Sequence, residues 1–402
     1  MDKITPRILK GFRDFLPSEM RKRQYVIDII KRTFELWGFE PIETPALEYL
    51  DIFKGNIGED EKLFYKFKDE GGREVALRYD QTVPTCRVVA QYPDKITFPF
   101  KRYQIQPSWR AEKPQKGRFR EFLQADVDIF GLNNPESDAE VIALTIDVFK
   151  ALGFKKPIAL INDRSLYKEV PYKAIVVIDK LEKIGEEKVL EELQKNGYSK
   201  DAATLLLQKI NNLKPNDNLM AIFRYLDDYS LRENYRFQPT LARSFSYSTG
   251  TIWEIIVEGF TAGSLAGGER FDKLVGRFFK KDIPAVGVGI GLDRIIVAMQ
   301  EFGLFPTLKT KTKVLVISLD KSLLSYSLDV ARKLRQALIN TDFYSNPDEK
   351  LNKKLKYADK KEISWVVIIG KDEKEKDLVK LKNMQTGKQE SLSLTEAIAK
   401  IR

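Results

Sequence analysis

Two runs of alternating apolar and polar residues, joined by a short basic loop, constrain the fold of this chain more than any other stretch. They lie within residues 100–131, FKRYQIQPSWRAEKPQKGRFREFLQADVDIFG. Alternation at every second position is typical of β-strands, and the loop from Lys113 to Arg120 contains the Pro and Gly residues that turn a chain. The stretch therefore predicts a β-hairpin with a cationic tip.

One face of this hairpin carries polar and charged groups. Side chains two residues apart on a strand share a face, so Gln124, Asp126 and Asp128 point the same way. On the first strand, alternate positions such as Lys101 and Tyr103 share a face in the same manner. Because arginines and carboxylates make a poor core, this surface predicts a floor for a small charged ligand.

The composition narrows the chemistry that the chain can perform. None of its 402 residues is histidine, which removes the commonest general acid or base and the usual zinc ligand. Catalysis must therefore depend on arginines, carboxylates and metal-bound phosphate.

Positive charge is concentrated toward the C-terminus. The formal net charge is +10, and residues 311–402 contain 20 Lys and Arg against 13 Asp and Glu. A basic terminal domain is typical of polyanion binding. A solvated lysine-rich surface explains the same charge equally well.

Several features predict a cytoplasmic protein without a membrane partner. No apolar run reaches the roughly 18 residues that suggest a membrane span. The N-terminal stretch MDKITPRILKGF lacks the apolar region of a secretory signal. The single cysteine, Cys86, fits a reducing compartment and is expected to be a small buried filler.

Changes in the patterns of apolar and charged residues divide the chain into segments with different predicted secondary structure. Residues 1–161 mix helix and strand patterns, residues 162–236 are charged and helical, and strand-like alternation returns in residues 237–305. Residues 312–402 predict an α/β domain with a mostly parallel sheet. We expect the second segment to be a helical insertion.

Local signals in the first segment predict where helices begin. Ser18 is a candidate N-cap for the first amphipathic helix, and Ser137 with Glu140 has the spacing of a capping box. Asp80 or Thr82, at the end of a predicted hairpin, would cap the helix-like run that follows them.

Glycine alternates with apolar residues in AVGVGIGLDR, residues 285–294. The pattern superficially suggests a dinucleotide-binding fingerprint. Such a fingerprint should open a helix after a strand, with an acidic residue about 20 positions further on. Glycine at every second position instead predicts one strand whose ligand-facing side has no side chains, followed by a helix that begins near Arg294.

Three motifs, in this order, resemble the signature motifs of class II aminoacyl-tRNA synthetases. They are the helix and strand that end at Pro45, the Arg110–Ala111–Glu112 triplet with its basic loop, and the glycine-alternating strand before Arg294. Further segments resemble the histidyl-tRNA synthetase family: KGFRDFLP, LRYDQTVP, RAEKPQKGRFREFLQADVDIFG, IDKLEKIGEE and AGGERFDKLV. KLNKKLKYADKKEISWVVIIG is similar to the anticodon-binding domain of that family.

This resemblance covers nearly the whole chain and implies both a fold and a function. The implied fold is an α+β catalytic domain with an antiparallel sheet flanked by helices, a helical insertion, and a C-terminal α/β anticodon-binding domain. The implied reaction activates histidine with ATP and transfers it to tRNA(His). The implied partners are histidine, tRNA(His), ATP with Mg²⁺ as a substrate complex, and a second copy in a homodimer, with no tightly bound metal.

The reaction is compatible with a chain that lacks histidine. Its first step is attack by an amino-acid carboxylate on the α-phosphorus of ATP, and this nucleophile is already anionic. The enzyme has to place two anions together and neutralise the charge that develops, which needs no general base.

The resemblance also implies roles for charged residues. Arg110 and Arg243 are the catalytic pair: Arg110 holds the α-phosphate, and Arg243 contacts the α-phosphate and the substrate carboxylate. Glu112 faces the adenine. Arg118 and Arg294 bind the β- and γ-phosphates, a task that suits planar and permanently charged guanidinium groups.

The implied amino-acid site uses polar residues from several segments. Asp80, Thr82 and Gln124 match positions that hold the α-amino group, and Asp128 matches the acidic residue that faces the imidazole ring. Three further positions complete the amino-acid site: Tyr247, Ser248 and Phe271. The implied tRNA contacts are lysines of the hairpin loop and of the basic C-terminal helix: Lys113, Lys116, Lys353, Lys354 and Lys356.

The chain departs from the family pattern at two of these positions. The family usually has two tyrosines followed by Thr-Gly, and a tyrosine in the glycine-rich turn; here Ser248 and Phe271 replace two of them. A hydroxyl group is therefore lost at Phe271 and an aromatic ring at Ser248. We expect a variant of the histidine pocket in which Ser248 carries water to the ring.

Two other functions fit the same resemblance. One is a non-catalytic paralogue that acts as a regulatory subunit of histidine biosynthesis by binding phosphoribosyltransferase subunits. The presence of residues 313–402 together with Arg110, Arg243 and Arg294 argues against it. The other is a tRNA-binding protein without catalytic activity, which would bind tRNA in a salt-dependent manner.

Overall fold

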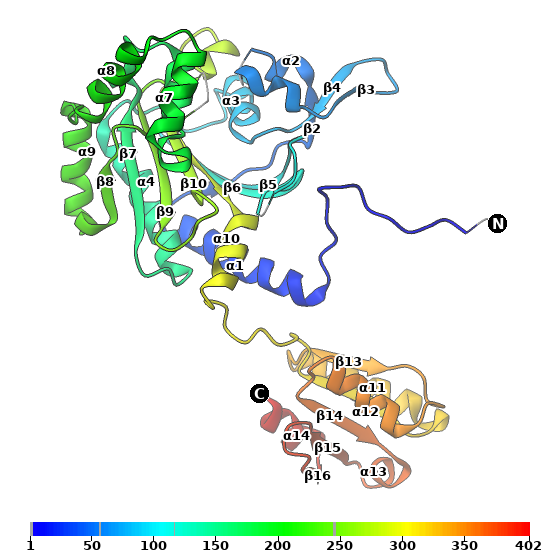
Figure 1. Ribbon diagram of the computed structural model, residues 1–402. Helices are drawn as coiled ribbons and strands as arrows, with labels where there is room; N and C mark the ends of the chain where they lie inside the picture. Colours follow the sequence, from blue (N-terminus) through cyan, green and yellow to red (C-terminus); the bar gives the residue numbers. More distant parts are fainter. Residues whose placement is uncertain (1–2, 56–57, 116, 244–246) are drawn as a thin grey trace. The chain divides into compact units, whose positions relative to one another are not determined.

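A computed structural model describes residues 3–55, 58–115, 117–243 and 247–402 (Figure 1). The chain forms two compact units: residues 22–305 with the segment up to Leu16, and residues 306–402 with residues 17–21. Within the described ranges, no helix has the length and apolar character needed to cross a membrane.

A large sheet forms the centre of the first unit. Its strands, in chain order, are β1 (Glu40–Pro41), β5 (Phe100–Trp109), β6 (Glu121–Phe130), β7 (Pro157–Asp163), β8 (Tyr235–Phe237), β9 (Thr251–Val257), β10 (Ala266–Arg270) and β11 (Ala285–Gly291). The spatial order is β1-β5-β6-β11-β10-β9-β7-β8. The strands from β5 to β7 pair antiparallel, whereas β1 and β8 pair parallel at the two edges. The predicted hairpin and the predicted glycine-alternating strand are confirmed.

One face of this sheet packs against helices α1 (Pro17–Leu36), α4 (Pro135–Ala151) and α10 (Leu292–Glu301) (Figure 1). Alternate residues of β6, such as Ala125 and Val127, join this apolar core. Since adjacent residues of a strand point to opposite faces, the remaining residues of β6 face the other side of the sheet.

The other side of the sheet carries a smaller layer. It contains a three-stranded antiparallel sheet and two helices around a second apolar cluster. The elements are β2 (Leu47–Tyr49), α2 (Leu50–Phe53), β3 (Lys66–Lys68), β4 (Glu74–Leu77) and α3 (Thr82–Gln91). Cys86 lies buried in this cluster, as predicted, and burial raises the pKa of its thiol.

The helices of residues 162–236 divide between two cores. They are α5 (Tyr172–Ile178), α6 (Leu181–Ile184), α7 (Glu186–Lys195), α8 (Lys200–Asn211) and α9 (Asp217–Asp228). Residues of α5, α7 and α8 form an apolar cluster of their own. Helix α9 instead packs on α4, and its residues Leu219, Ile222 and Leu226 belong to the core of the large sheet.

The second unit is an α/β domain around a five-stranded sheet of order β13-β12-β14-β15-β16. Its elements are β12 (Val314–Ser318), α11 (Leu324–Gln336), β13 (Thr341–Tyr344), α12 (Leu351–Lys360), β14 (Trp365–Ile369), α13 (Lys371–Glu375), β15 (Val379–Asn383), β16 (Gln389–Leu392) and α14 (Leu394–Ile401). Strand β12 pairs parallel with β13 and β14, but β15 pairs antiparallel with both neighbours. The prediction of a mostly parallel sheet is therefore wrong, because β15 pairs antiparallel with β14 and the exposed β16, which adds a second antiparallel pair, lacks a clear strand pattern. Short 3-10 helices complete the chain: η1 (Gly58–Leu63), η2 (Arg164–Tyr167), η3 (Arg232–Asn234), η4 (Val275–Arg277) and η5 (Lys321–Leu323).

The predicted starts of two helices are wrong. Helix α1 begins at Pro17 with Leu16 at the N-cap position, so Ser18 lies inside the helix. Ser137 likewise lies inside α4, where its hydroxyl donates to the carbonyl of Asn134 at 2.7 Å. A proline at the first helical position has no N–H that needs a cap, and in both helices it outweighs the serine signal.

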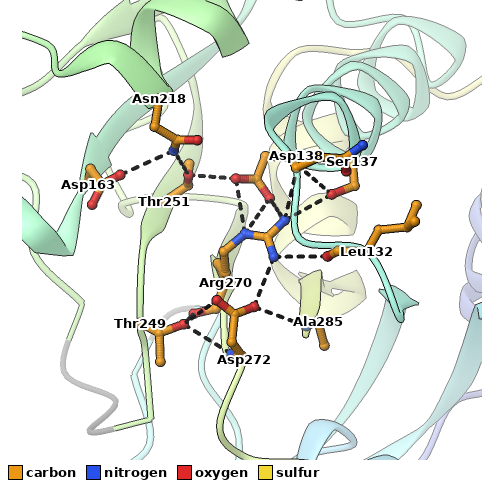
Figure 2. A network of polar contacts seen from close by, with 11 residues as sticks. Leu132, Ser137, Asp138, Asp163, Asn218, Thr249, Thr251, Arg270, Asp272 and Ala285 are labelled. Carbon is orange, nitrogen blue, oxygen red and sulfur yellow. Dashed lines mark hydrogen bonds and ion pairs between the residues drawn. The ribbon is translucent and has the colours of Figure 1, made fainter. Parts of the chain in front are cut away.

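A buried ion pair ties β10 to the start of α4 (Figure 2). The guanidinium of Arg270 donates to Asp138 at 2.6 Å, to the Ser137 hydroxyl at 2.9 Å and to Asp272 at 2.9 Å. Asp138 also accepts a hydrogen bond from the Thr251 hydroxyl at 2.7 Å. Because several partners hold Arg270, the orientation of β10 is fixed. The residue next to Arg270 in this strand therefore faces the other side of the sheet.

We expect Asp138→Ala to lower the free energy of unfolding by about 3–5 kcal/mol, because it leaves Arg270 buried without its carboxylate. Urea unfolding measures the change. Glu169→Ala is the control, since its pair with Lys209 is exposed to solvent and such pairs contribute at most about 1 kcal/mol. A loss for Asp138→Ala no larger than that of the control would contradict this role.

Candidate active site

A cavity of about 210 Å³ opens on the face of the large sheet opposite its apolar core. Strand β11 contributes Gly287, Gly289 and Gly291 to the lining, so part of its surface is bare backbone. Ten of the site residues expected from the sequence meet here: Asp80, Thr82, Arg110, Glu112, Arg118, Gln124, Arg243, Tyr247, Phe271 and Arg294.

The register of the hairpin sets the polar floor behind this cavity. Asp128 stands opposite Arg102, Asp126 opposite Gln104, and Gln124 opposite Gln106. Residues paired across neighbouring strands share a face, so Arg102 and Gln104 lie on the same face as the residues of the floor. Lys101 and Tyr103 lie on the opposite face. The sequence could not specify which residues of the two strands share a face, because the long connection of residues 110–120 leaves the register open.

Two glycines make room for charged side chains. A Cβ atom on Gly287 would overlap the Oδ1 atom of Asp128, and a Cβ atom on Gly267 would overlap the guanidinium of Arg243. The bare surface of β11 and β10 is therefore partly covered by side chains from neighbouring segments.

The cationic groups lie along the rim and one wall. The guanidinium carbon of Arg110 lies 4.3 Å from the centre of the Tyr79 ring, and its Nε donates to the Tyr79 carbonyl at 3.3 Å. Arg118 pairs with Glu112 at 3.1 Å. Arg294 donates to the Ser264 carbonyl at 2.6 Å, and burial, followed by the charge of Arg118, lowers its pKa. Several guanidinium groups close together attract an anion with more than one charge.

Arg243 lies in the loop before β9, not in a strand as its surrounding sequence predicts. Its Nη2 atom lies 3.5 Å from Glu269, and its Nη1 atom lies 3.9 Å from Glu254. The strand pattern begins only at Thr251, and residues 244–246 lie outside the described part of the chain.

Three buried carboxyl groups have raised pKa values. Burial raises the pKa of Asp126 to about 8 and those of Asp80 and Asp128 to about 6. Asp128 forms an ion pair with Arg102. Asp80 accepts the N–H of Val83 at 3.0 Å, so it caps α3 as one sequence interpretation predicted.

Some polar atoms at the cavity have no protein partner. Among the described residues, Oδ2 of Asp80, Oδ1 of Asp126 and Oε1 of Gln124 are buried and accept no hydrogen bond. Buried acceptors without donors destabilise a protein, so their presence beside a cavity indicates a ligand with several N–H groups.

Of the other residues expected at the amino-acid site, Phe271 lines the cavity, whereas Asp128 and Ser248 do not. Phe271 packs edge-on against Phe130 and Tyr247, with ring centres 6.0 and 6.2 Å away. Ser248 stands behind the lining, and its hydroxyl donates to Glu269. The expected water-carrying role of Ser248 therefore competes with a direct contact that the sequence did not predict.

The lysines expected to contact tRNA differ in exposure. Lys113 is exposed in the hairpin loop, Lys353 and Lys356 are exposed on α12, and Lys116 lies outside the described residues. Lys354 is buried, and its ammonium donates to the carbonyls of Ser318 at 2.7 Å and Pro347 at 2.9 Å. Its assignment as a tRNA contact is wrong, because it lies on the inner face of an amphipathic helix.

The sequence predicted no role for Glu269 or Arg102, although Glu269 lines the cavity and Arg102 pairs with Asp128 behind it. A signal was present for Glu269, since a charged residue that follows two glycines in a short strand is unusual. Arg102 carried no signal without the hairpin register.

Comparisons with known proteins agree with this geometry. A family model described as histidyl-tRNA synthetase matches residues 11–206 and 162–295, and one described as anticodon binding domain matches residues 313–402. Histidine–tRNA ligase from Cytophaga hutchinsonii is 36% identical, over 98% of this chain and 99% of the relative. The enzyme of the same name from Wolinella succinogenes is 37% identical, over 99% of this chain and 98% of the relative.

Solved structures show the same fold. The crystal structure of histidyl-tRNA synthetase from Nostoc sp. PCC 7120 matches with a TM-score of 0.83 and 30% identity, covering 99% of both chains. The fold is that of a class II aminoacyl-tRNA synthetase, which confirms the predicted fold class. Within that class, the chain belongs to the histidyl-tRNA synthetase family.

The raised pKa of Asp126 makes stability depend on pH. Burial raises it from its ordinary 3.8 to about 8, so between these values the folded protein keeps a proton that the unfolded chain releases. The free energy of unfolding therefore falls as the pH rises through this range. Asp126→Asn removes this titration, and we expect the variant to gain stability relative to the native protein between about pH 5 and about pH 8. Urea unfolding measures the difference in the free energy of unfolding between the variant and the native protein at the two pH values. If this difference is the same at both, the assignment of the raised pKa to Asp126 is contradicted.

We expect Gly287→Ala to lower the free energy of unfolding by about 1–3 kcal/mol, because the added methyl group displaces Asp128. Gly291→Ala is the matched control in the same strand, since its Cβ would meet its nearest neighbour at an ordinary 3.9 Å. Urea unfolding compares the two variants. Equal losses would show that the site above Gly287 is not filled as described.

Proposed function

We propose that this chain activates histidine with ATP to form histidyl-adenylate and transfers the histidyl group to tRNA(His). The observation that carries the proposal is the cavity itself, where Arg110, Arg243 and Arg294 line one space with Asp80 and Asp126. Arginines suit a triphosphate, and buried carboxylates suit an ammonium group and a ring N–H.

The arginines act on the phosphates in this proposal. Arg110 is held by the Tyr79 ring and carbonyl, so its guanidinium stands in a fixed orientation toward the α-phosphate. Arg243 neutralises the charge that develops when the histidine carboxylate attacks the α-phosphorus. Arg118 and Arg294 bind the β- and γ-phosphates, and the pyrophosphate leaves between them. Mg²⁺ enters as part of the ATP substrate.

The carboxyl groups hold the amino acid. Asp80, Thr82 and Gln124 bind the α-ammonium group, with the buried oxygens of Asp80 and Gln124 as its acceptors. Asp128, leaning over the bare Gly287, accepts a ring N–H. An amino acid without such a donor would leave these acceptors unpaired, which is the physical basis of selection.

The remaining part of the proposal concerns how the protein binds tRNA and whether it forms a homodimer. The match of residues 313–402 to an anticodon-binding domain supports tRNA binding by the second unit, with Lys353 and Lys356 as exposed candidates. Lys113 in the hairpin loop is a candidate for the acceptor end. Family membership supports a homodimer that works in the cytoplasm.

Pyrophosphate exchange with the purified protein tests the activity across the twenty amino acids. We expect histidine to stimulate exchange far more than any other amino acid. A regulatory or purely tRNA-binding protein would give no histidine-stimulated exchange, and that result would overturn the proposal.

We expect Arg243→Ala to lower histidyl-adenylate formation by a factor of about 100–1,000 or more, because it removes a charge at the reacting phosphate. tRNA binding should stay nearly unchanged, as Arg243 lines the cavity of the first unit. Single-turnover adenylate formation and tRNA filter binding measure the two effects. Comparable losses in both would contradict the assigned role.

A further inference from the structure

Glu269 is a charged residue near the end of β10, and the family resemblance assigns it no role. It is 5% exposed and lines the cavity. In the sheet it stands beside Gly287 of β11, which in turn stands beside Asp128 of β6. Neighbouring strands lie about 4.8 Å apart, so the backbones of Glu269 and Asp128 are roughly 10 Å apart with a bare glycine between them.

Among the described residues, Glu269 has two protein partners. Its Oε1 atom lies 3.5 Å from Nη2 of Arg243, and its Oε2 atom accepts the hydroxyl of Ser248. Ser248 stands where the family usually has a tyrosine that lines the imidazole pocket, and here its hydroxyl contacts Glu269 instead. A carboxylate accepts about four hydrogen bonds, so these partners leave Glu269 able to accept another from a ligand.

Asp128 faces Glu269 from the other side of Gly287. Its Oδ1 atom lies over Gly287, while the carboxylate is paired with Arg102 behind it. Burial is the main cause of the raised pKa of Asp128, and the charge of Glu269 adds to it. The two carboxylates are therefore close enough to influence one another, and Arg102 balances only the first of them.

We propose that Glu269 is a specificity-determining residue that accepts a hydrogen bond from the imidazole nitrogen that Asp128 does not bind. The inference rests on the proposed activation of histidine. An imidazole ring has its two nitrogens on opposite edges, and when protonated it donates from both. Two carboxylates that flank a bare glycine match such a ring, and a ring with one N–H leaves one buried carboxylate without a donor.

Other ionisable groups near Glu269 belong to the charge balance of this site. They come from β5, β6, β9, the hairpin base and the segments before α3 and β9: Arg102, Asp126, Asp128, Glu254, Arg110, Asp80, Arg243 and Tyr247. Glu254 also approaches Arg243, at 3.9 Å, but does not line the cavity. It is therefore the matched control, a carboxylate that approaches Arg243 without lining the cavity.

The test compares the native protein with Glu269→Gln and Glu254→Gln in histidine-dependent pyrophosphate exchange. Loss of one charged hydrogen bond predicts a KM for histidine that is roughly 10–100 times higher for Glu269→Gln, with the KM for ATP nearly unchanged. Glu254→Gln should leave the KM for histidine near the native value. A lower kcat or a higher KM for ATP in Glu269→Gln, with the KM for histidine unchanged, would show that Glu269 only positions Arg243 and would overturn the inference.

A measurement on the native protein needs no variant to fold. Between about pH 6.5, the ordinary pKa of an imidazole, and about pH 8.5, we expect the KM for histidine to rise several-fold or more. The isostere 1,2,4-triazole-3-alanine, whose ring stays unprotonated in this range, should show no such rise. Equal pH dependence for the two substrates would overturn the inference, whereas absence of any histidine-stimulated exchange would overturn the proposed function itself.

Discussion

The structure of the cavity depends on a steric constraint at Gly287. Strand β11 runs between β6, which carries Asp128, and β10, which carries Glu269. Because Gly287 has no side chain, the carboxylate of Asp128 can lean over it toward the cavity. A side chain there would displace this carboxylate, which we propose accepts a ring N–H of histidine. The apolar residues between the glycines face the core, so the same strand serves both packing and recognition.

The burial of carboxyl groups at the cavity connects the stability of this protein to its proposed function. Asp80, Asp126 and Asp128 are buried with raised pKa values, and unpaired oxygens of Asp80 and Asp126 face no donor in the described chain. The protein without ligand therefore carries a free-energy cost that a ligand with ammonium and N–H groups relieves. The Arg270–Asp138 pair on the other face holds β10 in place against this cost.

Much of the site was predictable from sequence because its residues lie in short motifs with strong local patterns. The hairpin, the glycine-alternating strand and the family resemblance identified the residues that line the cavity. Arg102 and the Arg270–Asp138 pair escaped prediction, since the first depends on strand register and the second joins residues far apart in the chain. Lys354 was misassigned because a basic helix does not show which of its lysines turns inward, and the strands β13 and β16 are too short to leave a pattern.

The central claim is that this cavity binds histidine and ATP together, with the imidazole ring between Asp128 and Glu269. A crystal structure of the protein with histidine and a non-hydrolysable ATP analogue tests it most directly. We predict the ring between Asp128 and Glu269, the α-ammonium group at Asp80 and the α-phosphate within reach of Arg110. Histidine bound elsewhere, or in this cavity with its ring away from Gly287, would contradict the account.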